Sequence, residues 1–177
     1  MQALKSSYVS DTDTFRIRQI DGSELERERE RVLYLIHQAI PLACVAEVGS
    51  TAIEGLIGKQ DLDFVVRVPS NSFEETRNTL DSTFPRNDEQ LSNAEYQGYV
   101  IPSQLDVAIQ LIVAGGKYDN FEKFLLRLSA SPSLKRAYNE LKVMWDGRPM
   151  REYRVAKQQF IDSVLSGNEE PDFCKPQ

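Results

Sequence analysis

The sequence predicts an α+β unit followed by a segment of three helices. Two observations indicate this. In the runs 60–68 and 103–113, apolar and polar residues alternate with the period of two that is typical of β-strands. After residue 116 the apolar spacing becomes helical, and Ser-Pro and Gly-Arg-Pro breaks divide that region.

The N-terminal part contains one charged helix. Residues 1–22 are polar, and we expect only a short strand at 15–20. The run 24–40 alternates glutamate with arginine, but its apolar residues share one stripe, so it predicts an amphipathic helix. The only histidine, His37, lies in the late turns of this helix, and we expect it at the surface or at the edge of the core.

The remaining elements follow from apolar runs and their breaks. Strands are predicted at 42–48, 60–68, near 95–101 and at 103–113, and a helix at 70–84. Helices are then predicted at 119–130, 131–147 and 148–167. We therefore expect an α/β core over 1–116, a three-helix segment over 117–166 and a tail over 167–177. The alternative is one compact domain.

Composition limits the classes of partner. The net charge is −6 and the pI about 4.9, which argues against a long nucleic acid bound by charge alone. Residues 1–114 are acidic and residues 115–165 are mildly basic. This asymmetry suits a carboxylate site that faces a phosphate-bearing ligand. The alternative is two solvated surfaces of different charge. No apolar run is long enough to span a membrane. Cys44 and Cys174 have neither disulfide nor zinc spacing, so we expect a reducing cytoplasm.

The aspartates of two predicted strands are the main chemical signal. Asp61 and Asp63 leave the same face of one strand, about 6.5–7 Å apart, and Asp106 interrupts another apolar strand. Ionised carboxylates so close together need a cation, and oxygen ligands suit Mg²⁺ or Mn²⁺. If the strands are neighbours, the three carboxylates converge on one patch. The alternative is a half-solvated sheet face, although aspartate is depleted in strands.

A glycine-serine turn adds a second signal. Gly49, Ser50 and Thr51 follow a predicted buried strand and offer backbone N–H groups and hydroxyls, which are natural ligands of phosphate. A glycine-serine pair is also a common strand terminator, so alone it decides little. Lys59, just before the strand with the two aspartates, is either a phosphate ligand or a solvated lysine.

Together these residues resemble a known family. The stretch VGSTAIEGLIGKQDLDFVV is similar to the signature of the GrpB family, within the polymerase-beta-like nucleotidyltransferase superfamily. The matching positions are Gly49, Ser50, Thr51, Gly55, Leu56, Lys59, Asp61 and Asp63. The similarity extends over most of residues 24–165, through a Tyr-x-x-Leu-Lys run and a Tyr-x-x-x-Lys-x-x-Phe-Ile run in the helical part.

The sequence departs from that family at three places. Glu54 and Gln60 stand where the family usually has proline, and Gln104-Leu105-Asp106 replaces its common His-Leu-His motif. The aspartate brings the chain closer to the three-carboxylate site of the wider superfamily.

The resemblance implies a nucleotidyltransferase-like small mixed sheet with packed helices, and transfer of a nucleoside monophosphate from an NTP to a small-molecule or protein hydroxyl with Mg²⁺ or Mn²⁺. It implies that Asp61 and Asp63 ligate metal, that Asp106 binds metal or acts as base, and that Gly49 and Ser50 hold phosphates. Tyr153 and Lys157 share one helix face and either line the cleft or simply pack there. The alternatives are a non-catalytic nucleotide- and metal-binding regulatory protein of the same fold, and an interaction protein that uses its helices. The NTP, the acceptor and the oligomeric state are not determined by the sequence.

Overall fold

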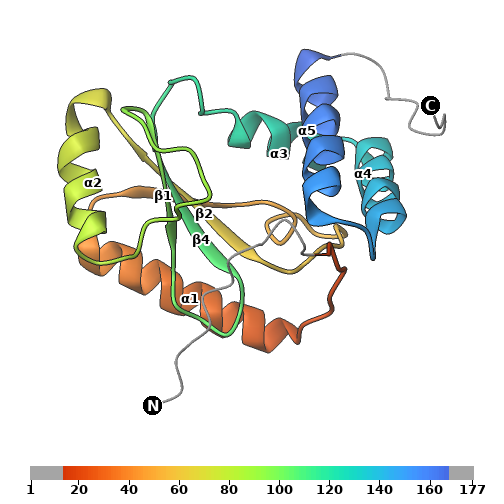
Figure 1. Cartoon of the computed structure of the whole chain (residues 1–177), viewed down its shortest axis with the longest axis horizontal. Coiled ribbons are helices and arrows are strands. Elements are labelled where there is room, and N and C mark those ends of the chain that lie inside the picture. Colours follow the sequence, from red (N-terminus) through yellow and green to blue (C-terminus); the bar gives the residue numbers. More distant parts are fainter. Residues whose placement is uncertain (1–13, 168–177) are drawn as a thin grey trace. The chain divides into compact units, whose positions relative to one another are not determined.

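The structure is a computed structural model that describes residues 14–167, and its contacts divide them into two compact units. The sheet unit comprises 20–49 and 61–120, and the helical unit comprises 14–19, 50–60 and 121–167 (Figure 1). Two short segments from the N-terminal half thus group with the C-terminal helices. Among the helices of residues 14–167, none has the length and apolar character needed to cross a membrane.

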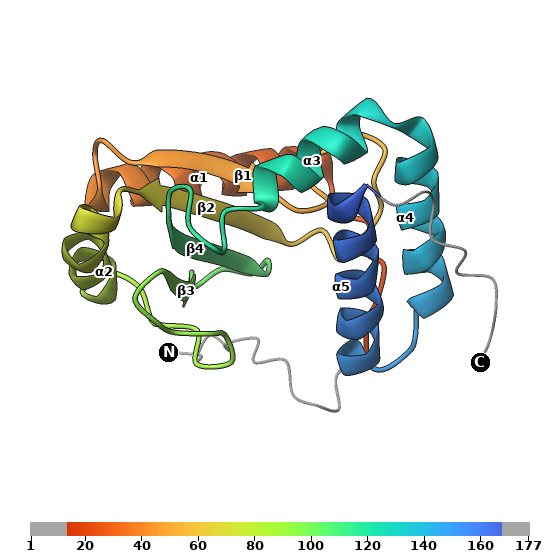
Figure 2. The same cartoon turned by 90° about the horizontal axis from the view of Figure 1, so that it is seen from above.

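The sheet unit is built on a mixed four-stranded sheet (Figure 2). Its strands are β1 (Cys44–Val48), β2 (Leu62–Val68), β3 (Tyr96–Val100) and β4 (Val107–Val113). The order is β1-β2-β4-β3, with β2 and β4 parallel and the two outer pairs antiparallel. This arrangement confirms the predicted small mixed sheet and makes β2 and β4 its two central strands.

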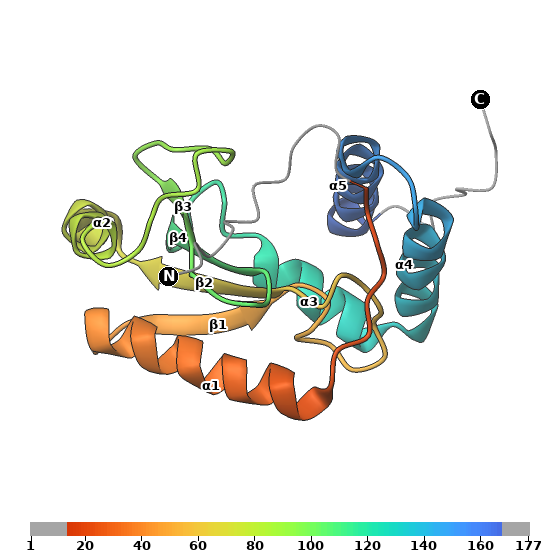
Figure 3. The same cartoon turned by 60° about the horizontal axis from the view of Figure 1, so that its bottom comes forward.

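Two helices cover one face of this sheet. They are α1 (Gly22–Ala39) and α2 (Phe73–Asp81), and α1 runs along the strands in Figure 3. The N-terminus of α1 is capped by Asp21, whose carboxylate accepts a hydrogen bond from Ser23 N at 2.8 Å. The core between helices and sheet consists of apolar side chains with helical spacing on α1 and α2 and period-two spacing on the strands, among them Val32, Ile36, Phe64, Leu80, Ile109 and Leu111. The amphipathic pattern read from the sequence therefore accounts for this layer.

The opposite face of the sheet carries the polar strand residues, but it is not an open, solvated face. Val65 and Ile112 on this face are fully buried, and Gln110 is 7% exposed. Arg67 donates to Asp119 at 2.7 Å, and both side chains are mostly buried. Polar groups on this face are therefore held in place by specific partners.

The helical unit contains the three predicted helices. They are α3 (Phe121–Ala130), α4 (Pro132–Trp145) and α5 (Met150–Ser166). Ser131 caps α4 through a hydrogen bond from Leu134 N, and Gly167 closes α5 in a left-handed conformation. The core of this unit includes Leu128, Tyr138, Leu141, Phe160 and Val164, together with Ile53 from the segment 50–60.

The strand predicted at 15–20 is wrong. Residues 15–20 form no strand, and Thr14 alone forms an isolated bridge, with Pro149. Phe15 N donates to Arg148 O, and the Phe15 ring, which is 1% exposed, stacks on Tyr153 at 3.7 Å. The segment is thus fixed by packing on α5. The histidine prediction is confirmed, since His37 is exposed on α1. Cys174 and nearly all of the predicted tail lie outside the described residues.

Candidate functional site

The pairing of β2 with β4 brings the backbones of the three aspartates together. Asp61 directly precedes β2, Asp63 is its second residue, and Asp106 directly precedes β4. In the parallel register Leu62 is opposite Val107, and Leu62 N donates to Asp106 O at 2.9 Å. Adjacent strands lie about 4.8 Å apart, so the three aspartates occupy neighbouring backbone positions at one end of the two central strands.

Strand alternation also places these aspartates on one face. Leu62 and Val107 belong to the core under α1 and α2, so the residues before and after each of them lie on the opposite face. Asp61, Asp63 and Asp106 are all half-buried. The two strands are direct neighbours, as the sequence analysis supposed, but Asp61 and Asp106 directly precede their strands and do not lie within them.

The glycine at the end of β1 is fitted to the carboxylate of Asp63. Val48 is opposite Asp63 in the antiparallel register, so Gly49 begins the turn beside it. Gly49 has φ +86, and a Cβ at this position would lie 3.1 Å from Asp63 Oδ2. Both the backbone conformation and the close carboxylate therefore favour glycine here.

The charge of Asp63 affects the pKa of Tyr96, a tyrosine on the edge strand β3. Its hydroxyl lies 3.1 Å from Gln90 Oε1 and 3.3 Å from Gln110 Oε1. Burial raises the pKa of Tyr96 well above its usual range, and the negative charge of Asp63 raises the pKa further. Hydrogen bonds thus join Tyr96 of β3 to Gln110 of β4 and to Gln90. The sequence pattern gave no signal for Tyr96 or Gln90.

The donor chemistry of the aspartates fits a hard divalent cation. Three carboxylates on one face repel one another, and oxygen ligands are those that Mg²⁺ and Mn²⁺ prefer. Among residues 14–167, no group of three or more His, Cys, Asp or Glu side chains is arranged to hold a metal ion. Metal ligation by Asp61, Asp63 and Asp106 therefore stays a prediction.

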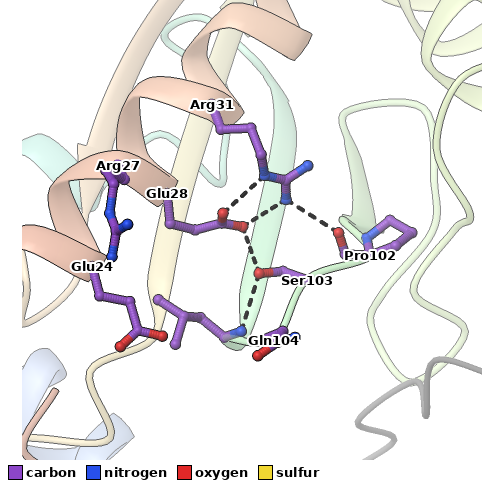
Figure 4. A pocket seen from close by; sticks show the side chains of 8 residues that line it. Glu24, Arg27, Glu28, Arg31, Pro102, Ser103 and Gln104 are labelled. Carbon is purple, nitrogen blue, oxygen red and sulfur yellow. Dashed lines mark hydrogen bonds and ion pairs between the residues drawn. The ribbon is translucent and has the colours of Figure 1, made fainter.

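A network from α1 holds the turn that leads into Asp106 (Figure 4). Ser103 Oγ donates to Glu28 Oε1 at 2.5 Å and accepts a hydrogen bond from Leu105 N at 3.0 Å. Arg31 binds both oxygens of Glu28 and donates to Pro102 O at 3.1 Å. The hydrogen bond from Arg31, and then that from Ser103, lowers the pKa of Glu28 against the effect of burial.

The same network lines a groove of about 390 Å³ between α1 and residues 102–105. The groove exposes groups of both signs, including Glu24 and Arg27. None of the predicted site residues lines it. Its relation to the site is therefore indirect, through the turn that precedes Asp106.

The other predicted residues belong to the helical unit. Ser50, Thr51 and Lys59 are half-buried in the segment 50–60. Tyr153 on α5 is 6% exposed and stacks on Phe15, which matches the packing alternative for this tyrosine, and Lys157, one turn later, is half-buried. A packed ring does not test a role in nucleotide binding, so the roles of these residues stay predictions.

Backbone strain occurs directly before the first aspartate. Gln60 has φ +57 and is the only non-glycine residue of 14–167 with a positive φ. A left-handed conformation costs a residue with a Cβ roughly 1–2 kcal/mol. Proline, with φ fixed near −65°, could not adopt it. Gln60, where the family usually has proline, therefore has a backbone conformation that proline could not adopt.

Known proteins similar to this chain agree on one family. The model of the GrpB protein family matches residues 22–166. A UPF0157 protein of Vibrio cholerae is 32% identical over 127 residues, which cover 71% of this chain and 68% of that protein. The crystal structure of the conserved protein GrpB from Enterococcus faecalis is similar with a TM-score of 0.59 and 16% identity, covering 87% of this chain and 99% of that chain.

A more distant similarity involves the Cid1 poly(U) polymerase with MgGTP bound. Its TM-score is 0.48 at 15% identity, covering 71% of this chain and 43% of that chain. A similarity of this extent carries no weight for the fold or for the chemistry.

Proposed function

The chain belongs to the GrpB protein family, and from this membership and the geometry of its aspartates we propose that it is a metal-dependent nucleotidyltransferase. The reaction transfers a nucleoside monophosphate from an NTP to the hydroxyl of a small molecule or a protein. The net charge of −6 disfavours a long nucleic acid as acceptor.

One observation carries the proposal, namely the parallel pairing of β2 with β4. This pairing puts Asp61, Asp63 and Asp106 at neighbouring positions of one sheet face. Keeping three acidic residues side by side beside a buried sheet is unfavourable unless a cation neutralises them. A site with this composition is suited to a ligand that brings both a divalent cation and phosphate groups.

In the proposed reaction the acceptor oxygen forms a bond with the α-phosphorus of the NTP. The bond between that phosphorus and the oxygen bridging to the β-phosphate breaks, and pyrophosphate leaves. Asp106 takes the proton of the acceptor hydroxyl, or serves with Asp61 and Asp63 as a metal ligand. A bound Mg²⁺ or Mn²⁺ would supply charge neutralisation at the phosphates. Gly49, Ser50 and Thr51 would bind phosphate oxygens through N–H and hydroxyl groups.

Three further residues have supporting roles in this proposal. Lys59 would contribute a positive charge to the phosphates, and Tyr153 and Lys157 would line the nucleotide site. These roles rest on the family resemblance and on the position of each residue in the sequence.

A second candidate is a non-catalytic nucleotide- and metal-binding regulatory protein of the same fold. Residues 14–167 contain no group of three or more His, Cys, Asp or Glu side chains arranged to hold a metal ion, and this finding bears on both candidates alike. A protein that binds but does not turn over needs metal and nucleotide affinity, and it needs no base for an acceptor.

Radioactive label transfer separates the two candidates. The purified chain is incubated with Mg²⁺ or Mn²⁺, a pool of metabolites or proteins, and each of the four NTPs labelled either at the α- or at the γ-phosphate. Nucleotidyl transfer moves the α-label into product and releases the γ-label as pyrophosphate. Binding without transfer of either label would support the second candidate.

Two variants and one control test the assignment of the site. Asp61→Asn and Asp63→Asn should each abolish α-label transfer while circular dichroism shows an unchanged fold. Glu89→Gln, an exposed carboxylate of the same unit, should keep full transfer. Full activity in both aspartate variants would show that the site lies elsewhere.

A further inference from the structure

Two side chains on one face of α4 bind the backbone of the segment 50–60. Asn139 Nδ2 donates to Gly55 O at 2.8 Å, and Asn139 Oδ1 accepts from Ile57 N at 3.1 Å. Lys142, one turn further along the same face, donates through Nζ to Ile57 O at 2.6 Å. Both polar groups of the Ile57 backbone are therefore bound by α4, and we call Asn139 and Lys142 the α4 clamp.

Lys142 is the unusual member of the clamp because it is only 1% exposed. Its ammonium group lies 3.9 Å from the centroid of the Tyr138 ring, which itself stacks on Phe160 at 4.9 Å. Burying an ammonium group is costly, and a methionine of similar length would fill the same space without that cost. What methionine could not supply is the charged hydrogen bond to the backbone of residue 57.

The clamp holds the segment at the place where Ser50 contacts it. A Cβ at Gly58 would lie 2.7 Å from Ser50 Oγ and 3.8 Å from Lys142 Nζ, so both groups lie against the same glycine. On its other side Gly58 O accepts a hydrogen bond from Arg18 N at 2.9 Å. The position of the Ser50 hydroxyl thus depends on a turn whose backbone α4 fixes.

We propose that Asn139 and Lys142 are positioning residues that fix the segment 50–60 in the conformation that binds the phosphates of the nucleotide. The inference rests on the proposed function, in which Ser50, Thr51 and Lys59 of this segment serve the NTP. The clamp acts before the nucleotide binds, by keeping the turn 55–58 in one conformation. Its loss therefore weakens nucleotide binding more than it slows the chemical step.

The first test uses the full chain without nucleotide. Hydrogen exchange followed by mass spectrometry measures the protection of residues 50–60 in Lys142→Met, Asn139→Ala and the wild type. A charged hydrogen bond is worth roughly 10- to 100-fold in an equilibrium. We therefore expect exchange in this segment to rise by about 10-fold or more in Lys142→Met, while peptides of the sheet unit keep their protection.

The second test measures nucleotide binding and turnover. Lys142→Met and Asn139→Ala should raise the KM for MgNTP by roughly 10-fold or more and change kcat less than about 3-fold. Lys142→Arg keeps the charge and the donor, and it should recover most of the affinity. A residue that only supports the fold would instead lower Tm and reduce kcat and protection throughout the chain.

Lys135→Met is the matched control, since it makes the same substitution two turns earlier on α4 at a half-buried position. It should leave both readouts unchanged. Unchanged protection of residues 50–60 in both clamp variants, or an equal loss in Lys135→Met, would overturn the proposal. If Lys142→Met fails to fold, Asn139→Ala carries the same test, because it removes the other two hydrogen bonds of the clamp. If the wild type binds no nucleotide, the proposed function fails, and hydrogen exchange still decides whether the clamp exists.

Discussion

Replacing Gly49 with alanine tests whether the turn after β1 is fitted to the carboxylate of Asp63. The chain offers a close control in Gly55, which has the same φ of +86. A Cβ at Gly49 would lie 3.1 Å from Asp63 Oδ2, whereas a Cβ at Gly55 would meet nothing within 4 Å. The two substitutions share the backbone cost and differ in the contact with the aspartate.

The expected magnitudes follow from this difference. Alanine in a left-handed conformation costs roughly 1–2 kcal/mol, so both variants should lose about 2–8 °C in Tm. In Gly49→Ala the Asp63 side chain must also shift by a few tenths of an ångström to relieve the contact. Displacing the surroundings of a metal ligand typically weakens metal binding by about 10- to 100-fold. We expect a loss of that size in Gly49→Ala only.

The assay combines thermal unfolding with Mn²⁺ titration followed by electron paramagnetic resonance, and neither depends on turnover. Similar Tm losses with a selective loss of Mn²⁺ affinity in Gly49→Ala would support the fit between turn and carboxylate. If the two variants bind Mn²⁺ equally well, the contact between Gly49 and Asp63 does not shape a metal site and the reasoning fails.

Three further predictions concern stability and are measured by urea unfolding. Hydrogen bonds from Arg31 and Ser103 lower the pKa of Glu28. The contribution of Glu28 to the free energy of unfolding is therefore complete above about pH 4.5, and it is lost as the pH falls through the lowered pKa. Glu28→Gln should therefore flatten the loss of stability between about pH 5 and 3, and an unchanged slope would contradict this. Asp119→Ala should cost about 2–4 kcal/mol, because it leaves the mostly buried Arg67 without a carboxylate at 2.7 Å; a cost under about 0.5 kcal/mol would show an exposed, weak pair. Gln60→Gly relieves roughly 1–2 kcal/mol of strain but adds about 0.5–1 kcal/mol of unfolded-state entropy, for a net gain between about 0 and 1.5 kcal/mol. Gln60→Pro should destabilise instead, and the reverse order would contradict the φ of +57.

The layer structure of the sheet unit could be predicted because local periodicity encodes it. The alternation around Asp63 and Asp106 specifies which face of each strand is apolar, and the structure has those faces. The pairing of β2 with β4 could only be supposed from sequence, since the two strands are about 40 residues apart and their register depends on tertiary packing. The segment 14–19 was missed for a similar reason, because Phe15 is fixed by a ring on α5 that is far away in the sequence.

In the candidate site, too, the sequence indicates some residues and not others. The aspartates and the glycine-serine turn are visible in sequence because aspartate and glycine are unusual where apolar strand residues are expected. Tyr96, Lys142 and the network from Glu28 to Ser103 are not visible, because a tyrosine, a lysine or a glutamate carries no local signal of burial. Lys142 and the network from Glu28 to Ser103 acquire their roles from partners more than 40 residues away. The partners of Tyr96 are nearer in sequence, but Gln110 lies on β4 and Gln90 in the loop before β3.

Asp106→Asn separates transfer from binding at the end of β4. Asparagine has nearly the shape of aspartate and leaves the backbone carbonyl that accepts from Leu62 N, so the turn from Ser103 should persist. It removes the charge that would take the proton of the acceptor hydroxyl, and a general base contributes roughly 10²- to 10⁴-fold to a rate. We expect α-label transfer to fall by that factor, while MgNTP affinity changes by less than about 10-fold because Asp61 and Asp63 remain. Asp88→Asn, an exposed aspartate of the same unit, should leave both quantities unchanged. Full transfer in Asp106→Asn would remove Asp106 from the chemistry and leave a site of two aspartates.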